Sequence, residues 1–157
     1  MINEDYRALA EFRYQIRRFL AVSEEIAHGA KLRPQQYMML LALRGLPKGK
    51  EPTVAALAER LKIRHNSAVE LADRLARRGL VRRRRSESDC RKVFVELTGK
   101  GAALIEKLVE KRFVQLNSSQ PALVRALNRV LARTNVRRTA ACKKPRSYGV
   151  RRGIASP

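Results

Sequence analysis

The sequence predicts a mainly α-helical protein with one small β-hairpin: a helix-turn-helix followed by a wing, with longer helices on either side. Three observations support this prediction. Two short amphipathic segments are separated by a very brief joint, two alternating runs follow them directly, and apolar stripes flank the whole set. The 157 residues suit one domain with appendages, and 45% of them are hydrophobic, which is enough to form a core.

Four segments have helical periodicity, and turn residues separate them. Thr53 is a favourable N-cap for the third segment, and Gly79 ends the fourth. The joint between the third and fourth segments is so short that the two helices must cross steeply. This is helix-turn-helix spacing, although an ordinary αα-corner in a helical bundle would give the same spacing. The four predicted helices cover residues 5–28, 34–44, 53–61 and 65–78.

Two extended runs, residues 80–85 and 93–97, follow the fourth helix and are joined by the polar connector SESDCRK. Val93, Val95 and Leu97 share one face of the second run. A two-stranded hairpin directly after two crossed helices is a wing, and this pattern favours the helix-turn-helix over the αα-corner.

Helical periodicity returns after the wing, over residues 98–116, with Thr98 as the expected cap. Pro121 is expected to open a last helix that runs to about Arg133, since proline suits a first helical turn. Periodicity fades after Asn135, so residues 135–157 are expected to form a flexible or irregular basic tail.

The net charge of +21, from 35 basic and 14 acidic side chains, implies an anionic partner: nucleic acid, an acidic protein surface or an anionic membrane. The charge is concentrated in two zones. Residues 60–92 hold 12 basic residues and four acids, and residues 135–157 hold seven basic residues and no acid. Only the first zone combines charge with apolar periodicity, and the tail lacks the amphipathic face that membrane binding needs.

Other functional classes have little support in the sequence. Cys90 and Cys142 have neither metal-ligand nor disulfide spacing, and the N-terminus does not resemble a signal peptide. The longest apolar run, Tyr37–Leu43, is too short to span a bilayer. There is no glycine-rich phosphate loop and no catalytic triad. We therefore expect a cytoplasmic protein that is not an enzyme, with no cofactor, no metal site and no membrane partner.

The second helix of the pair is expected to read the major groove of double-stranded DNA with its N-terminal residues. Arg64 suits guanine, Asn66 suits adenine, and Val69 suits a thymine methyl group. The alternative is that Asn66 and Ser67 only cap the helix. The predicted DNA-binding residues are Arg64, His65, Asn66, Ser67, Val69, Glu70, Arg74, Arg82, Arg84, Arg91 and Lys92.

The four arginines of the first strand fall on two faces. Alternation puts Arg82 and Arg84 on one face and Arg83 and Arg85 on the other. One pair can face the DNA backbone while the other lies beside the domain's own acids or in solvent. The wing tip, Arg91–Lys92, suits a narrow minor groove. A merely solvated charge run is the alternative.

Asp89 is an acid within this cationic tip, where it would repel phosphate unless it is paired. We expect Asp89 to form a salt bridge with an arginine of the wing or the recognition helix and so to orient that arginine. A turn-forming aspartate is the alternative. Cys90 lies between Asp89 and Arg91, which can alter its thiol pKa, and a chance exposed cysteine is again the alternative.

Together these residues resemble the MarR family of winged-helix transcription regulators, over about residues 32–108. The wing pattern is the most specific part, since family members typically carry an Asp-x-Arg tip, an alternating strand and then Leu-Thr-x-Lys-Gly. Cys90 stands where the family often has arginine. The matching residues are Asp89, Arg91, Val93, Val95, Leu97, Thr98, Lys100 and Gly101.

The resemblance implies a homodimer that binds a pseudo-palindromic operator, acts as a repressor and is released by a small phenolic or lipophilic effector. Candidate effector-lining residues are Tyr14, Arg17, His28 and Tyr37, each of which has a core or surface role as its alternative. Some family members sense oxidants through a cysteine in the first helix, which this chain lacks.

The implied organisation has four parts. They are an N-terminal dimerisation helix (residues 1–31), a winged helix-turn-helix domain (32–98), C-terminal dimerisation helices (99–134) and a basic tail (135–157).

A nonspecific architectural or RNA-binding protein is the rival function, since charge and a basic tail suffice for it. The uncharged side chains of Asn66 and Ser67 favour the specific regulator, because phosphate neutralisation alone does not require them.

Overall fold

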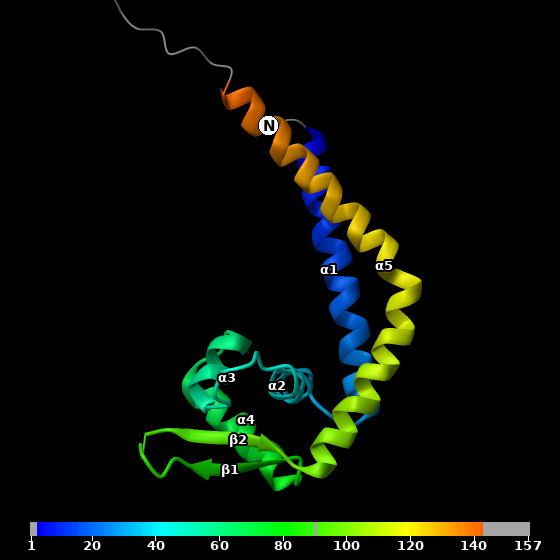
Figure 1. Ribbon diagram of the computed structural model, residues 1–157. Coiled ribbons are helices and arrows are strands. Elements are labelled where there is room, and N and C mark those ends of the chain that lie inside the picture. Colours follow the sequence, from blue (N-terminus) through cyan, green and yellow to red (C-terminus); the bar gives the residue numbers. More distant parts are fainter. Residues whose placement is uncertain (1–2, 90, 143–157) are drawn as a thin grey trace, which may run out of the picture. The chain divides into compact units, whose positions relative to one another are not determined.

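The computed structural model describes residues 3–89 and 91–142. Five helices and one two-stranded antiparallel sheet follow one another along the described chain (Figure 1). The predicted fold class, mainly α with a small hairpin after a helix-turn-helix, is confirmed. The elements are α1 (Asn3–Gly29), α2 (Pro34–Arg44), α3 (Val54–Leu61), α4 (His65–Arg77), β1 (Val81–Arg85), β2 (Val93–Leu97) and α5 (Gly99–Cys142).

The chain divides into two compact units. One unit is Arg17–Gln120 and contains the helix-turn-helix and the wing. The other consists of Met1–Ile16 and Pro121–Pro157, of which residues 3–16 and 121–142 are described.

The helix-turn-helix forms where the local signals predicted it. The Thr53 hydroxyl accepts a hydrogen bond from the backbone N–H of Ala56 (3.2 Å), so Thr53 caps α3 as expected. Lys62, with a left-handed φ of 55°, ends α3. Gly79 follows α4 with φ 68°, a conformation that glycine adopts without steric cost, and the chain turns there into β1.

The wing is attached to the helix-turn-helix by more than the β1–β2 ladder. The ladder pairs Arg82 with Glu96 and Arg84 with Phe94. On its other side β2 contacts the segment before α3, since the N–H of Val95 donates to the carbonyl of Pro52 (2.8 Å). An isolated bridge between Thr53 and Phe94 lies beside this bond. The wing is therefore a continuation of the packed domain.

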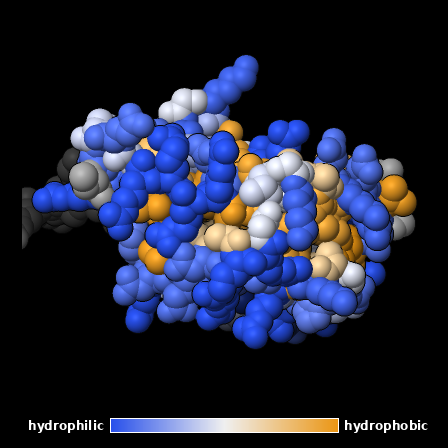
Figure 2. Space-filling view, turned by 90° about the horizontal axis from the view of Figure 1, so that it is seen from below, coloured by the Kyte–Doolittle hydropathy of each residue, from blue (hydrophilic) through white to orange (hydrophobic). Residues whose placement is uncertain are grey.

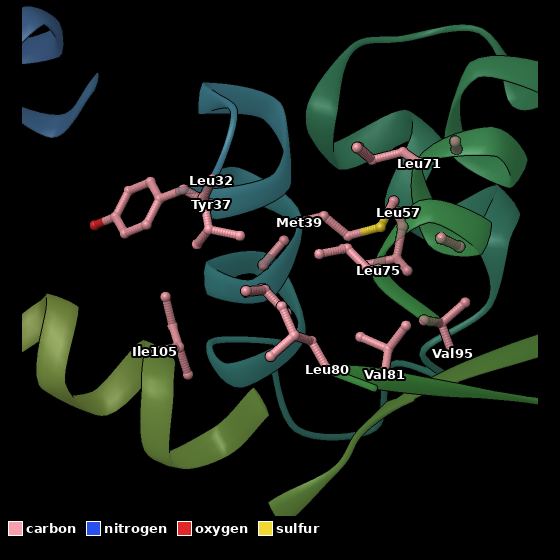
Figure 3. Packing of buried hydrophobic residues seen from close by; sticks show 14 of the residues in the cluster. Leu32, Tyr37, Met39, Leu57, Leu71, Leu75, Leu80, Val81, Val95 and Ile105 are labelled. Atoms are coloured by element: carbon pink, nitrogen blue, oxygen red, sulfur yellow. The ribbon is translucent and has the colours of Figure 1, made fainter. Parts of the chain in front are cut away.

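One hydrophobic core joins α2, α3, α4 and the wing within this unit (Figure 3). Met39 from α2, Leu57 from α3 and Leu75 from α4 are fully buried and lie close together in Figure 3. Val95 of β2 and Ile105 of α5 are also fully buried, so the core extends to the wing and to the start of α5. The core sets the position of α4 while the opposite face of α4 remains exposed.

The junction between the wing and α5 depends on one close backbone approach. The Thr98 hydroxyl accepts a hydrogen bond from the N–H of Gly101 (3.1 Å) and caps α5 as predicted. A Cβ atom at Gly101 would lie 1.9 Å from the carbonyl oxygen of Leu80, which itself accepts the N–H of Thr98. Only glycine fits here, which is a physical reason for the glycine of the Leu-Thr-x-Lys-Gly pattern.

The expected break at Pro121 is wrong. A single helix, α5, runs from Gly99 to Cys142 and includes Pro121. Proline removes one helical hydrogen bond, but the turns on both sides keep the helix continuous. The predicted tail boundary is also wrong, because residues 135–142 are helical; their arginine and alanine residues are good helix formers. The remainder of the predicted tail lies outside the described residues.

The unit made of the two ends of the chain has little core of its own. Arg133 of α5 pairs with Glu4 (2.7 Å) and Asp5 (2.9 Å) of α1. Ala126 is its one buried hydrophobic residue among those described, whereas many large apolar side chains are exposed. These exposed residues are Tyr6, Leu9, Tyr14, Val124, Leu127 and Leu131.

Candidate nucleic-acid interface

The first turn of α4 presents four consecutive exposed side chains, Arg64–Ser67. Burial of Ala68, Leu71, Ala72 and Leu75 anchors the opposite face of the helix in the core. The N-cap residue is Arg64, and α4 has no side-chain cap, so the alternative that Asn66 and Ser67 cap the helix does not hold. Within residues 3–89 and 91–142, these four side chains make no intramolecular hydrogen bond or ion pair.

The next predicted DNA-binding residues of α4 are less available. Val69 is half-buried against the core. Glu70 accepts a hydrogen bond from Arg74 (3.3 Å), and both side chains remain largely exposed. Such an exposed pair on one helix is weak, so Arg74 can exchange Glu70 for another anion at little cost.

The arginines of β1 are divided between two faces, as alternation predicted. Arg82 donates to Glu96 (2.8 Å), and Arg84 lies 3.6 Å from the same carboxylate and 4.9 Å from the centroid of the Phe94 ring. The Arg82 and Arg84 pair, expected to contact DNA, thus lies beside an acid of the domain itself, Glu96. Both guanidinium groups still lie at the surface, and the face seen from below is mostly hydrophilic (Figure 2).

The two cations of the wing tip differ in their surroundings. Lys92 pairs with Glu51 (3.0 Å), and this hydrogen bond raises the pKa of Lys92 above its ordinary value. Arg91 is exposed, and within the described parts of the chain its side chain has no ion pair. Arg91 is therefore the cation at the tip that is most available to an external anion.

The expected salt bridge of Asp89 is not observed. Its carboxylate accepts the backbone N–H of Arg91 (3.0 Å), and Asp89 makes no ion pair with an arginine of the described chain. The turn-forming alternative therefore holds. Asp89 fixes the backbone from which Arg91 projects. Cys90 lies outside the described residues.

The four candidate effector residues divide between the two units, and three of them, Arg17, His28 and Tyr37, belong to the unit Arg17–Gln120. Tyr37 is buried in the core, whereas Arg17 and His28 are exposed on α1. Arg17 and His28 are three helical turns apart, about 16 Å along the axis, which is too far to line one small pocket. Tyr14 belongs to the other unit, where it lines a groove of about 850 Å³ with Ala8 and Arg133.

Arg112 is a buried charge that the sequence pattern did not single out. Its Nη2 donates to the carbonyl of Phe19 (2.8 Å), and its guanidinium lies 4.2 Å from the Phe19 ring centroid. Its Nε and Nη1 have no hydrogen-bond partner among the described residues. Burial lowers the pKa of Arg112 and raises that of the nearby Tyr37 hydroxyl. The available signal was its position four residues from both Leu108 and Leu116, on an apolar stripe.

Neither a metal site nor a membrane span is present in the described chain. No group of three or more His, Cys, Asp or Glu side chains in residues 3–89 and 91–142 could hold a metal ion. No helix of that part of the protein combines the length and the apolar character needed to cross a membrane.

The fold and this surface define a winged helix-turn-helix protein. A sequence model described as the MarR family matches residues 31–92. The organic hydroperoxide resistance transcriptional regulator of Bacillus subtilis (strain 168) is 36% identical over 74 residues, which are 47% of this chain and half of that relative's length. Over residues 31–92 the chain is similar to the MarR family, in agreement with the resemblance seen in its sequence.

Solved structures share this fold. AbsC, a MarR family transcriptional regulator from Streptomyces coelicolor, has a TM-score of 0.70 at 19% identity, covering 89% of this chain and 97% of AbsC. BpsR of Bordetella bronchiseptica, whose DNA binding is regulated by 6-hydroxynicotinic acid, has a TM-score of 0.59 at 26% identity, covering 78% and 94%. All three of these relatives regulate transcription or bind DNA.

Proposed function

We propose that this protein is a sequence-specific DNA-binding transcription regulator, acting as a repressor on a pseudo-palindromic operator. The observation that carries this proposal is the exposed, unpartnered turn Arg64–Ser67 at the start of α4, on a helix whose other face is fixed in the core. Side chains without internal partners lose no contacts when they bind base edges in the major groove. Arg91 is available at the wing tip for an adjacent groove.

Asn66 provides the direct test of base reading. Selection of bound fragments from random DNA with the wild-type protein should yield one recurrent, symmetric sequence. Because the Asn66 amide is suited to pair with adenine, the Asn66→Ala variant should bind with a relaxed preference at one position of each half-site, losing about 1–3 kcal/mol of discrimination there. An unchanged selected sequence would count against direct readout by Asn66.

We propose that the protein acts as a homodimer through its end segments. Val124, Leu127 and Leu131 are exposed at three- and four-residue steps on α5, in a unit with little buried apolar surface. An apolar stripe of this kind favours burial against a second copy, and two copies would place two recognition helices on successive major grooves.

A double variant tests dimerisation. Leu127→Glu with Leu131→Glu should be monomeric and bind the selected operator at least tenfold more weakly, because two charges would be buried at the interface. Analytical ultracentrifugation and DNA titration measure the two effects. Arg125→Glu, at an exposed position on another face of α5, should remain dimeric. A dimeric double variant would exclude this stripe as the interface.

We also propose release from DNA by a small phenolic or lipophilic effector. BpsR, which responds to a hydroxylated aromatic acid, supports this class of ligand. The unpaired guanidinium donors of Arg112 suit an acid of this kind, and they lie near the hydroxyl of Tyr37, one of the four candidate effector residues.

The same net charge also supports the alternative function, that of a nonspecific architectural or RNA-binding protein. This alternative predicts no recurrent sequence in the selection experiment and a preference for DNA that disappears as salt is raised.

A further inference from the structure

The recognition helix, α4, and the wing, formed by β1 and β2, face each other across a small cavity. His65 and Val69 lie on one face of α4 at a four-residue step, and Asp73 continues that face. His65 and Val69 line a cavity of about 180 Å³ with Arg83, Arg91 and Val93 of the wing. Outside the hydrophobic core, this cavity therefore separates α4 from the wing at the end nearest the wing tip.

One ion pair joins α4 to the wing, and its Arg83 also lines this cavity. The Nη1 of Arg83 on β1 donates to Oδ1 of Asp73 on α4, and both side chains are about one-third exposed. Among the ion pairs of the described residues, this one joins the recognition helix to the wing. The arginines on the opposite face of β1 instead pair with Glu96 inside the hairpin.

We propose that Asp73 and Arg83 are positioning residues, which set the separation of the recognition helix and the wing so that both engage DNA at once. This inference rests on the proposed function. A partly exposed ion pair contributes little to folding stability. We therefore assign this pair a role in fixing the separation between α4 and the wing. In this proposal Arg83 binds Asp73 of the same chain and does not contact a DNA phosphate.

Replacement of Asp73 with asparagine separates positioning from simple electrostatics, because the two predict opposite signs. Removing an acid from a DNA-facing surface should strengthen binding to every sequence if charge alone matters. Loss of positioning should instead weaken binding to the selected operator by about tenfold, while binding to a scrambled duplex is unchanged or stronger.

Glu96→Gln is the matched control. It removes one carboxylate from an arginine pair of the same strand, but that pair lies within the hairpin and does not connect it to α4. We expect Glu96→Gln to keep the operator preference over the scrambled duplex. The exchange variant Asp73→Arg with Arg83→Asp restores a pair of reversed polarity and should recover most of the preference lost in Asp73→Asn.

The outcomes are distinguishable in titrations of the full-length protein at two salt concentrations, with melting temperature as a second readout. Operator binding by Asp73→Asn that equals or exceeds wild type overturns the inference, as does identical behaviour of Asp73→Asn and Glu96→Gln. A loss accompanied by a lowered melting temperature and a lost dimer also overturns it, since the pair would then be structural. A wild-type protein without operator preference would instead contradict the proposed function.

Discussion

Replacing Gly101 with alanine should lower the free energy of unfolding by about 3 kcal/mol. The new Cβ would lie 1.9 Å from the carbonyl oxygen of Leu80 and 2.9 Å from its carbonyl carbon. The Leu80 carbonyl cannot move away easily, because it accepts the N–H of Thr98 and Leu80 is buried. The gain in helix propensity from alanine, about 1 kcal/mol, is too small to offset this clash.

Urea denaturation followed by circular dichroism measures this effect. Gly99→Ala is the matched control, because it lies in the same first turn of α5 and its Cβ would meet no atom within 4 Å. Gly99→Ala should be neutral or stabilise the protein by about 0.5 kcal/mol. Equal midpoints for the two variants would show that the close approach of α5 to Leu80 is not present in solution.

Replacing Arg91 with alanine should weaken binding to the selected operator by about 1–3 kcal/mol. Arg91 is exposed at the wing tip and has no ion pair within the described residues, so its guanidinium is available to DNA. The Asp89 carboxylate fixes the backbone of Arg91, which reduces the conformational entropy lost on binding.

Titration of a labelled operator duplex measures the loss, and Arg44→Ala provides the comparison. Arg44 is an exposed arginine at the end of α2, outside the recognition helix and the wing. Its removal should change affinity only slightly. If Arg91 enters the minor groove, the Arg91→Ala variant should lose more affinity for the operator than for a scrambled duplex. Equal losses of affinity for the two duplexes would show that Arg91 contacts only phosphate.

The helix-turn-helix and the wing could be predicted because their signals are local. Thr53 caps α3, which begins at the next residue, and Gly79 adopts the left-handed conformation that ends α4. The alternation of residues 93–97 predicts β2. These features need no knowledge of distant parts of the chain.

The length of α5 could not be predicted in the same way. Pro121 is compatible with a first helical turn and also with a helix interior, and the choice between them depends on the surrounding structure. The local signal favoured a start at Pro121, whereas the structure has a continuous helix.

The partners in the ion pairs also could not be predicted from the sequence. Alternation correctly divided the arginines of β1 into two faces, but it could not say that Glu96 lies opposite Arg82 or that Asp73 lies beside Arg83. Those pairs depend on strand register and on the packing of α4 against β1. For the same reason the sequence predicts an arginine partner for Asp89, whereas the Asp89 carboxylate accepts a backbone N–H.

We propose that the first turn of α4 and the wing tip together read a DNA sequence. Competition binding at increasing salt tests it most directly, with the selected operator labelled and bulk DNA as competitor. We expect total affinity to fall with salt while the operator remains preferred by at least a thousandfold. A preference that vanishes together with the total affinity would contradict the claim and leave a purely electrostatic binder.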